Sequence, residues 1–335
     1  MALMDAAIRS TISGASKRPA VNLALVYQPS LAPISIDPSK YANALSPTNP
    51  QGDMLALRRF YDSIGNAVPN WAYAFAPSQQ RVDRLYGALI QGARPADHAD
   101  MQAIIAKAKQ TISLAQAPPV VVGDTTWVPT YPDQDDWSNP DQMTSSVSIA
   151  LNAIPPGTGS VSTIGQPAPI TWSFVGYSMQ LPVATTTTVF SIGFSYRVIN
   201  LVRPWWDWVL INSPKWSADG IVAGGISDPR SPGGKLMPLV PTAFVVAKNI
   251  ALTVKAIGND ARILSLIAAK DWQVNLGQIQ FGRTQANLED PDFRAVLSSG
   301  STASGPASEQ TFQLQGSAIQ ILGWVSAKLP KLPPR

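Results

Sequence analysis

From about Thr144 onward, apolar and polar residues alternate with a period of two. In one segment, every second position is apolar: Phe190, Ile192, Phe194, Tyr196 and Val198. Successive side chains of a strand point to opposite faces, so this alternation predicts half-buried β-strands. We expect residues 144–335 to form an antiparallel β-sandwich.

Three of the predicted strands change the parity of their apolar positions at a glycine. The segments and their glycines are 170–181 with Gly176, 273–281 with Gly277, and 311–321 with Gly316. An extra residue at a glycine is typical of a β-bulge, which lets a bent strand keep its apolar side chains on one face. We therefore predict three bulged strands. The alternative is that each segment is two short strands joined at the glycine.

Helical periodicity is confined to the first part of the chain. One helix is expected after Asp53 as N-cap, a second from Ser78 to about Gly92, and a third after Asp97. A weaker helical pattern covers residues 2–12. The Pro-rich stretch 19–50 is expected to be extended chain that lies over other elements.

The composition changes between the helical and β-rich parts. Residues 118–143 contain five acidic groups, no basic group, several prolines, Trp127 and Trp137. We predict an α+β protein in which a small helical part (1–117), a Pro/Asp/Trp-rich connector (118–143) and the β-sandwich (144–335) follow one another.

The overall composition favours binding over catalysis. Charged residues make up 14% of the chain, well below the roughly 25% typical of soluble proteins, so part of the surface is expected to be uncharged. The net charge of +4 is spread thinly, which argues against nucleic acid as a partner. The chain has no cysteine, and its only histidine is His98. A Cys–His site is excluded, and a Ser–His–Asp triad would need His98.

The sequence predicts no membrane-spanning helix. No apolar run approaches the roughly 20 residues that a span needs, and residues 1–17 show no signal peptide. We expect synthesis as a soluble cytoplasmic protein. Export by a route that uses no N-terminal signal is left open.

The connector holds the densest set of oxygen ligands. Asp133, Asp135, Asp136 and Asp141 are candidates for a calcium site. The spacing departs from an EF-hand loop, because Ser138 stands where glycine is needed and Thr144 where the bidentate Glu belongs. An Asp-rich turn without metal is the alternative, and the fold needs no cofactor.

A tryptophan-rich segment is the most distinctive local feature. Its candidate binding residues are Arg203, Trp205, Trp206, Asp207, Trp208 and Trp216. Such a cluster suits a surface that contacts a sugar ring, a lipid interface or a protein. The alternative is a packed corner in which Arg203 stacks on tryptophan and meets Asp207.

Three hypotheses of function follow. The first is a non-enzymatic protein that self-associates or contacts a membrane or glycan through the Trp-rich surface, such as a secreted effector or pore-forming toxin. The second is a glycan hydrolase using carboxylates such as Asp133, Asp135 or Asp207. The third is a structural subunit of a shell, filament or injection apparatus, which predicts a defined homo-oligomer without ligand.

Overall fold

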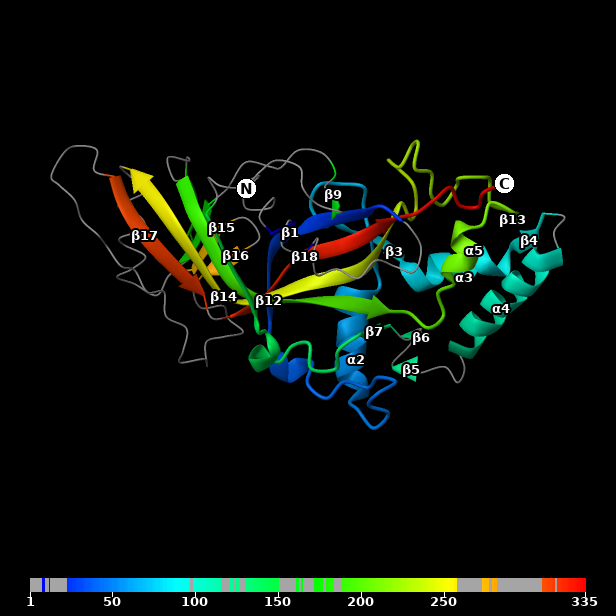
Figure 1. The fold of residues 1–335 in the computed structure, drawn as a ribbon, viewed down its shortest axis with the longest axis horizontal. Coiled ribbons are helices and arrows are strands. Elements are labelled where there is room, and N and C mark those ends of the chain that lie inside the picture. Colours follow the sequence, from blue (N-terminus) through cyan, green and yellow to red (C-terminus); the bar gives the residue numbers. More distant parts are fainter. Residues whose placement is uncertain are drawn as a thin grey trace.

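The chain folds into mostly antiparallel β-sheet with a few helices, as an α+β protein (Figure 1). The computed structural model describes residues 8–9, 12, 23–96, 99–115, 121–122, 125–126, 130–150, 161–162, 164, 172–176, 179–183, 188–257, 273–276, 279–281, 309–316 and 318–335.

The main sheet has eight strands and is open. Its order is β7-β12-β14-β18-β1-β9, with β8 also paired to β12 and β17 to β14. The strands are β1 (Leu25–Ile36), β7 (Tyr131–Pro132), β8 (Ser145–Ala150), β9 (Val161–Ser162), β12 (Thr188–Val202), β14 (Leu239–Ile257), β17 (Glu309–Gly316) and β18 (Ile319–Lys328). Among the described strand pairs of this sheet, only β1 with β9 is parallel. The strands β12 and β14 have 15 and 19 residues, beyond the usual limit of about 10.

The long strands bend where β14 carries an extra residue. Gly193 lies opposite Ala251 and Ser195 opposite Lys248, so three steps on β14 face two on β12. Within this bulge Asn249 has φ of 51°, a left-handed conformation that asparagine tolerates better than most residues. Figure 1 shows β14 changing direction partway along its length.

The bulge predicted at Gly316 agrees with the register of β17 and β18, which follow one another along β14. Gly316 lies opposite Ile250 and Gln320 opposite Ala247. Four steps on one strand therefore face three on the other, which is the extra residue that a bulge inserts.

The other two predicted bulges are wrong, because those segments are β-hairpins. β10 (Trp172–Gly176) pairs with β11 (Met179–Val183), and β15 (Gln273–Leu276) pairs with β16 (Ile279–Phe281). In each hairpin, two residues separate the paired strands. Together they form a separate four-stranded sheet in the order β11-β10-β15-β16.

The Pro-rich stretch 19–50 contributes a strand to the main sheet. It contains β1, which pairs with β18 from Leu25 opposite Ala327 to Ile36 opposite Ile319. The division of the chain into parts at 118–143 stays a prediction.

The main helices are α2 (Met54–Phe60), the π-helix η2 (Tyr61–Gly65), α3 (Val82–Gln91), α4 (Ala99–Ala115) and α5 (Trp208–Asn212). Figure 1 shows α3, α4 and α5 together at one end of the molecule, whereas α2 lies near the middle. Asp53 caps α2 through Leu55 N–H, as predicted. The second helix begins later than predicted, because residues from Ser78 lie in β3 (Pro77–Arg81), which pairs with β2 (Ala67–Pro69). Of the predicted helix 2–12, residues 8, 9 and 12 are described and are helical, whereas Asp97 and His98 lie outside the described residues.

Short elements complete the described structure. They are β4 (Ala93–Pro95) paired with β13 (Trp216–Ala218), β5 (Val121–Val122) paired with β6 (Thr125–Thr126), and the 3₁₀-helices η1 (Pro38–Lys40) and η3 (Pro140–Gln142).

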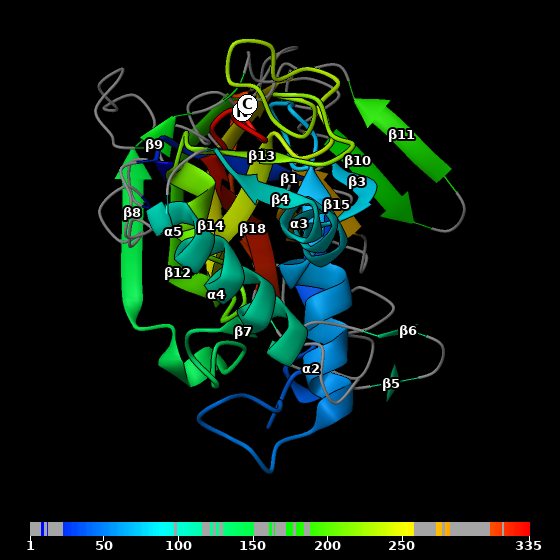
Figure 2. The ribbon, with the colours of Figure 1, turned by 90° about the vertical axis from the view of Figure 1, so that its right-hand side faces the viewer.

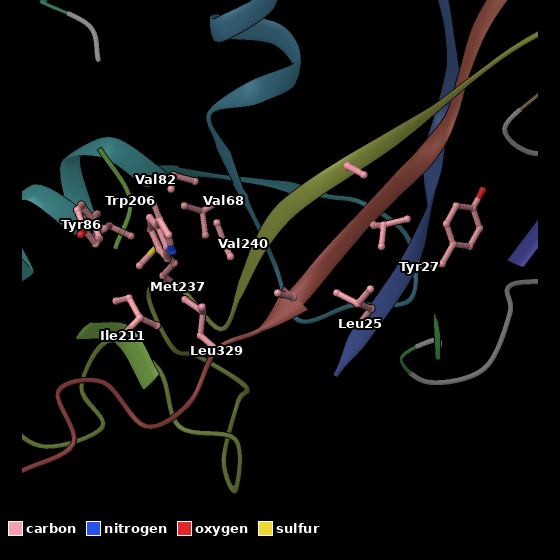
Figure 3. Close-up of a cluster of buried hydrophobic side chains, with 14 of the residues drawn as sticks. Leu25, Tyr27, Val68, Val82, Tyr86, Trp206, Ile211, Met237, Val240 and Leu329 are labelled. Carbon is pink, nitrogen blue, oxygen red and sulfur yellow. The ribbon is translucent and has the colours of Figure 1, made fainter. Parts of the chain in front are cut away.

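One large core joins helices and sheet. Buried side chains of α3, such as Tyr86, belong to the same cluster as Leu25 and Tyr27 of β1 and Val240 of β14 (Figure 3). A second, aromatic cluster contains Phe60, Trp137, Phe244 and Trp324. The helices near the first cluster are thus held by burial of apolar surface, the main favourable contribution to folding.

Candidate functional site

Three of the four predicted contact tryptophans lie in the core. Trp205, Trp206 and Trp216 have exposed fractions of 0%, 8% and 0%, and Trp208 is half-buried. Trp206 stacks on Tyr86 of α3 with ring centroids 4.5 Å apart, and Figure 3 shows the two rings side by side. This part of the segment is a packed corner, and only Trp208 leaves part of its side chain accessible to a partner.

Arg203 and Asp207 bind separate partners, so the contact expected between them is wrong. The guanidinium of Arg203 donates to the carbonyls of Pro241 and Gly65, both at 2.6 Å. Burial lowers the pKa of Arg203 to about 10. The carboxylate of Asp207 instead accepts from two backbone N–H groups of α5 at 2.9 and 3.0 Å. Each charged side chain hydrogen-bonds to backbone groups at the end of a helix, which lack partners within the helix.

Two side chains, Trp324 and Arg203, donate hydrogen bonds to carbonyl groups at the end of the π-helix η2. The indole N–H of Trp324 donates to the carbonyl of Ile64 at 3.3 Å, and Arg203 to that of Gly65. These contacts satisfy carbonyls that the helix end leaves open. π-helical turns are rare, and nothing in the sequence of this segment indicates one.

A buried carboxylate lies beside the same helix. Asp83 is 4% exposed and accepts from the hydroxyl of Tyr61 at 2.6 Å and the amide of Asn66 at 2.8 Å. The guanidinium of Arg81 lies 3.6 Å away and over the ring of Tyr61. A buried charge needs such partners. The network is therefore accounted for by its role in the folded structure. Its residues carry no sequence signal beyond their polarity.

The acidic turn does not assemble its carboxylates around one point. Asp133 accepts from the backbone and side-chain amides of Asn200, and Asp136 accepts from Arg197 at 3.1 Å. Asp135 accepts from the hydroxyl of Thr48. Within the described part of the chain, no group of three or more His, Cys, Asp or Glu is placed to hold a metal ion. The calcium ligands predicted here, Asp133, Asp135, Asp136 and Asp141, are thus not brought together.

Instead, the turn forms one wall of a pocket of about 700 Å³. Residues 38–49 form the other wall. Both walls contain a 3₁₀-helix that begins with a proline after a capping residue: Asp37 accepts from Ser39 N–H, and Asn139 accepts from Asp141 N–H. The hydrogen bond from the Ser39 side chain lowers the pKa of Asp37. Nothing in the sequence indicates that these two turns, about a hundred residues apart, face each other.

The two walls are fixed to one another and to the core. Tyr41 of one wall and Trp137 of the other meet edge to face, with ring centroids 5.1 Å apart. Trp137 is fully buried and packs on Phe60 and Phe244. The hydrogen bond from Thr48 to Asp135 joins the walls at a second point. The pocket is therefore built before any ligand arrives.

The carboxylates suggested for a hydrolase are engaged in structure. Asp207 caps α5, and both carboxylate oxygens of Asp133 accept hydrogen bonds from Asn200. Both carboxylates thus hold amide groups of the fold in place.

No helix in the described portion has both the length and the apolar content needed to cross a bilayer. Comparisons of the chain with protein-family models, with curated proteins and with solved structures gave no match.

Proposed function

We propose that the chain is a non-enzymatic assembly protein whose copies associate through an open edge of the main sheet. The observation that carries the proposal is the composition of β8 (Ser145–Ala150), which pairs with β12 on one side and has no second partner strand among the described residues. Figure 2 places β8 at the outer side of the sheet. An open edge presents unpaired backbone N–H and C=O groups to other strands.

β8 lacks the features by which monomeric proteins protect such an edge. Its sequence, SSVSIA, contains no charge and no proline, and it pairs with β12 without a register shift. Charged side chains, prolines and bulges are the usual means of blocking edge-to-edge pairing. Ser146 and Ser148 are exposed and small, so they offer little steric hindrance to a second strand.

The neighbouring strands place further hydroxyl side chains near β8. Ile192 and Leu252 are buried on one face, whereas Ser191 and Thr253, which lie opposite each other, are half-exposed on the other. The next strand places Gln313 beside Thr253. A hydroxyl-bearing face next to an apolar face suits a sheet that adds strands from other copies. Assembly of this kind is shared by a shell or filament subunit and by a secreted effector or pore-forming protein that associates at a membrane.

We further propose that the four-stranded sheet packs on the main sheet as the second layer of a sandwich. Ile279 of β16 is fully buried and belongs to the larger core cluster, which supports this arrangement.

The test is the mass of the protein in solution by light scattering, with and without phosphatidylcholine vesicles. We expect a discrete oligomer in at least one condition. Ser148→Lys places a charge on the open edge and should return the protein to the monomer. The matched control is Ser231→Lys, at an exposed loop position, which should leave the oligomer unchanged.

The two conditions separate the assembly types. An oligomer in buffer alone supports a structural subunit, whereas growth only with vesicles supports a membrane-acting protein. A monomer in both conditions, or an oligomer that Ser148→Lys leaves intact, would overturn the proposal.

A further inference from the structure

We propose that the pocket between residues 38–49 and 135–140 binds a saccharide. This inference is independent of the proposed self-association. The volume of about 700 Å³ lies within the range of about 300–1,000 Å³ found for small-molecule sites. Eight of its eleven lining residues have hydroxyl, amide or carboxylate side chains.

The pocket offers hydrogen-bond donors and acceptors together. Asn43 accepts from Asn49 through its side-chain oxygen, and Asn139 accepts from the backbone of Asp141 in the same way. Among the described residues, the amide nitrogens of Asn43 and Asn139 have no partner. These two –NH₂ groups are therefore available to donate to a ligand.

The hydrogen-bond acceptors of the pocket include two carboxylates. Asp135 uses one carboxylate oxygen to accept from Thr48, and Asp136 uses one to accept from Arg197. The second oxygen of each carboxylate has no hydrogen-bond partner in the described part of the chain. Both residues are exposed, and because an ionised carboxylate only accepts, these oxygens can accept from donors of a ligand.

A saccharide matches both sets. A sugar hydroxyl donates one hydrogen bond and accepts others, so neighbouring hydroxyls match an array of amides and carboxylates. A cation would use the carboxylates alone. An anion would be repelled by them, and no Lys or Arg lines the described pocket. Pro38, Ala42 and Pro140 give the apolar patches that the C–H faces of a sugar ring need.

Rigidity of the walls supports binding. Both 3₁₀-helices are capped, and the walls are joined by the Tyr41–Trp137 contact and the Thr48–Asp135 hydrogen bond. A site that is already ordered loses little conformational entropy when a ligand enters.

The experiment uses the labelled full-length protein on a printed array of glycans ending in mannose, galactose, glucose, N-acetylglucosamine or N-acetylgalactosamine. We expect selective binding to one or a few termini. Ala42→Trp fills the pocket and should abolish this binding, whereas Ala223→Trp adds the same ring at an exposed position outside the pocket and should not. Circular dichroism and the melting temperature verify that both variants fold.

Asn139→Asp distinguishes the ligand classes. The aspartate keeps the acceptor that caps η3 but removes the amide donor and adds a negative charge. Binding of a saccharide should weaken at least tenfold, whereas binding of a cation should strengthen. The proposal is overturned if no glycan binds, if Ala42→Trp binds as well as the wild type, or if spermidine binds in calorimetry and does so more tightly to Asn139→Asp.

Discussion

Phe75 stacks on Trp324, with ring centroids 3.8 Å apart and ring planes inclined by 16°. Phe75 lies just before β3, and its N–H donates to the carbonyl of Pro29 in β1. Trp324 belongs to β18 and donates its indole N–H to the end of the π-helix. This pair therefore joins a loop, two strands and a helix end at one place in the core.

Replacing Trp324 by Phe should destabilise the protein by about 1–3 kcal/mol. The variant keeps an aromatic ring but leaves the buried Ile64 carbonyl without its donor and leaves a small cavity. Urea unfolding measures the change as a lower midpoint with an unchanged slope. Trp208→Phe, at a half-buried position, is the control. Equal effects of the two substitutions would contradict the role given to the indole N–H.

Gly323→Ala should destabilise the sheet by about 1–3 kcal/mol or more, because the new methyl group overpacks a filled site. A Cβ at Gly323 would lie 2.5 Å from the carbonyl oxygen of Gln28 and 2.7 Å from the Tyr27 ring. A Cβ at Gly233 would meet nothing within 4 Å, so Gly233→Ala should be neutral or slightly stabilising. The two melting temperatures check this, and a Gly323→Ala protein as stable as Gly233→Ala would refute the close approach of β1 and β18.

Asp207→Ala should cost about 0.5–2 kcal/mol, because α5 loses its N-cap. Asp207→Asn should cost much less, since asparagine accepts the same backbone hydrogen bonds. Denaturant midpoints of the two variants measure the difference. If both substitutions destabilise equally, the carboxylate charge matters beyond capping.

Tyr86 should make stability depend on alkaline pH. Burial raises the pKa of Tyr86 above its usual value of 10.0, so above pH 10 the folded state holds a proton that the unfolded state releases. The contribution of Tyr86 to the free energy of unfolding is fully present below the unfolded-state pKa and is lost as the pH rises above it. Between about pH 9 and about pH 11, the wild type should lose more stability than Tyr86→Phe. Parallel urea midpoints across that interval would show that Tyr86 does not contribute.

Local signals in the sequence predicted local structure well. The cap at Asp53 and the alternation that makes β12 half-buried depend on neighbouring residues, and both are present. The sequence did not show which tryptophans of the 203–216 segment are exposed, and Trp205 and Trp206 both lie in the core.

The predictions of two of the bulges are wrong for a geometric reason. In a hairpin with a two-residue turn, Gly176 pairs with Met179 and Phe174 with Leu181. Even positions thus face odd ones, and the apolar pattern changes parity at the turn. A one-residue bulge changes parity in the same way. The pattern alone cannot separate the two, and only the partner strand decides.

The candidate pocket was beyond prediction because its walls are distant in sequence. Asp135 was identified as an oxygen ligand, but its partner Thr48 lies 87 residues earlier. Contacts of this kind depend on the global topology, which no local pattern encodes.

The pairing of β1 with β18 also sets an order of events during synthesis. Tyr27 donates to the carbonyl of Leu322, 295 residues later in the chain. At about 5–20 residues per second, the ribosome needs roughly 15–60 seconds to cover that interval. During that time, β1 has no β18 to pair with along the edge that β18 occupies in the folded protein. A ribosome stalled before residue 319 would hold a chain whose core cannot close, and such a chain is a natural substrate for chaperones and quality-control proteases.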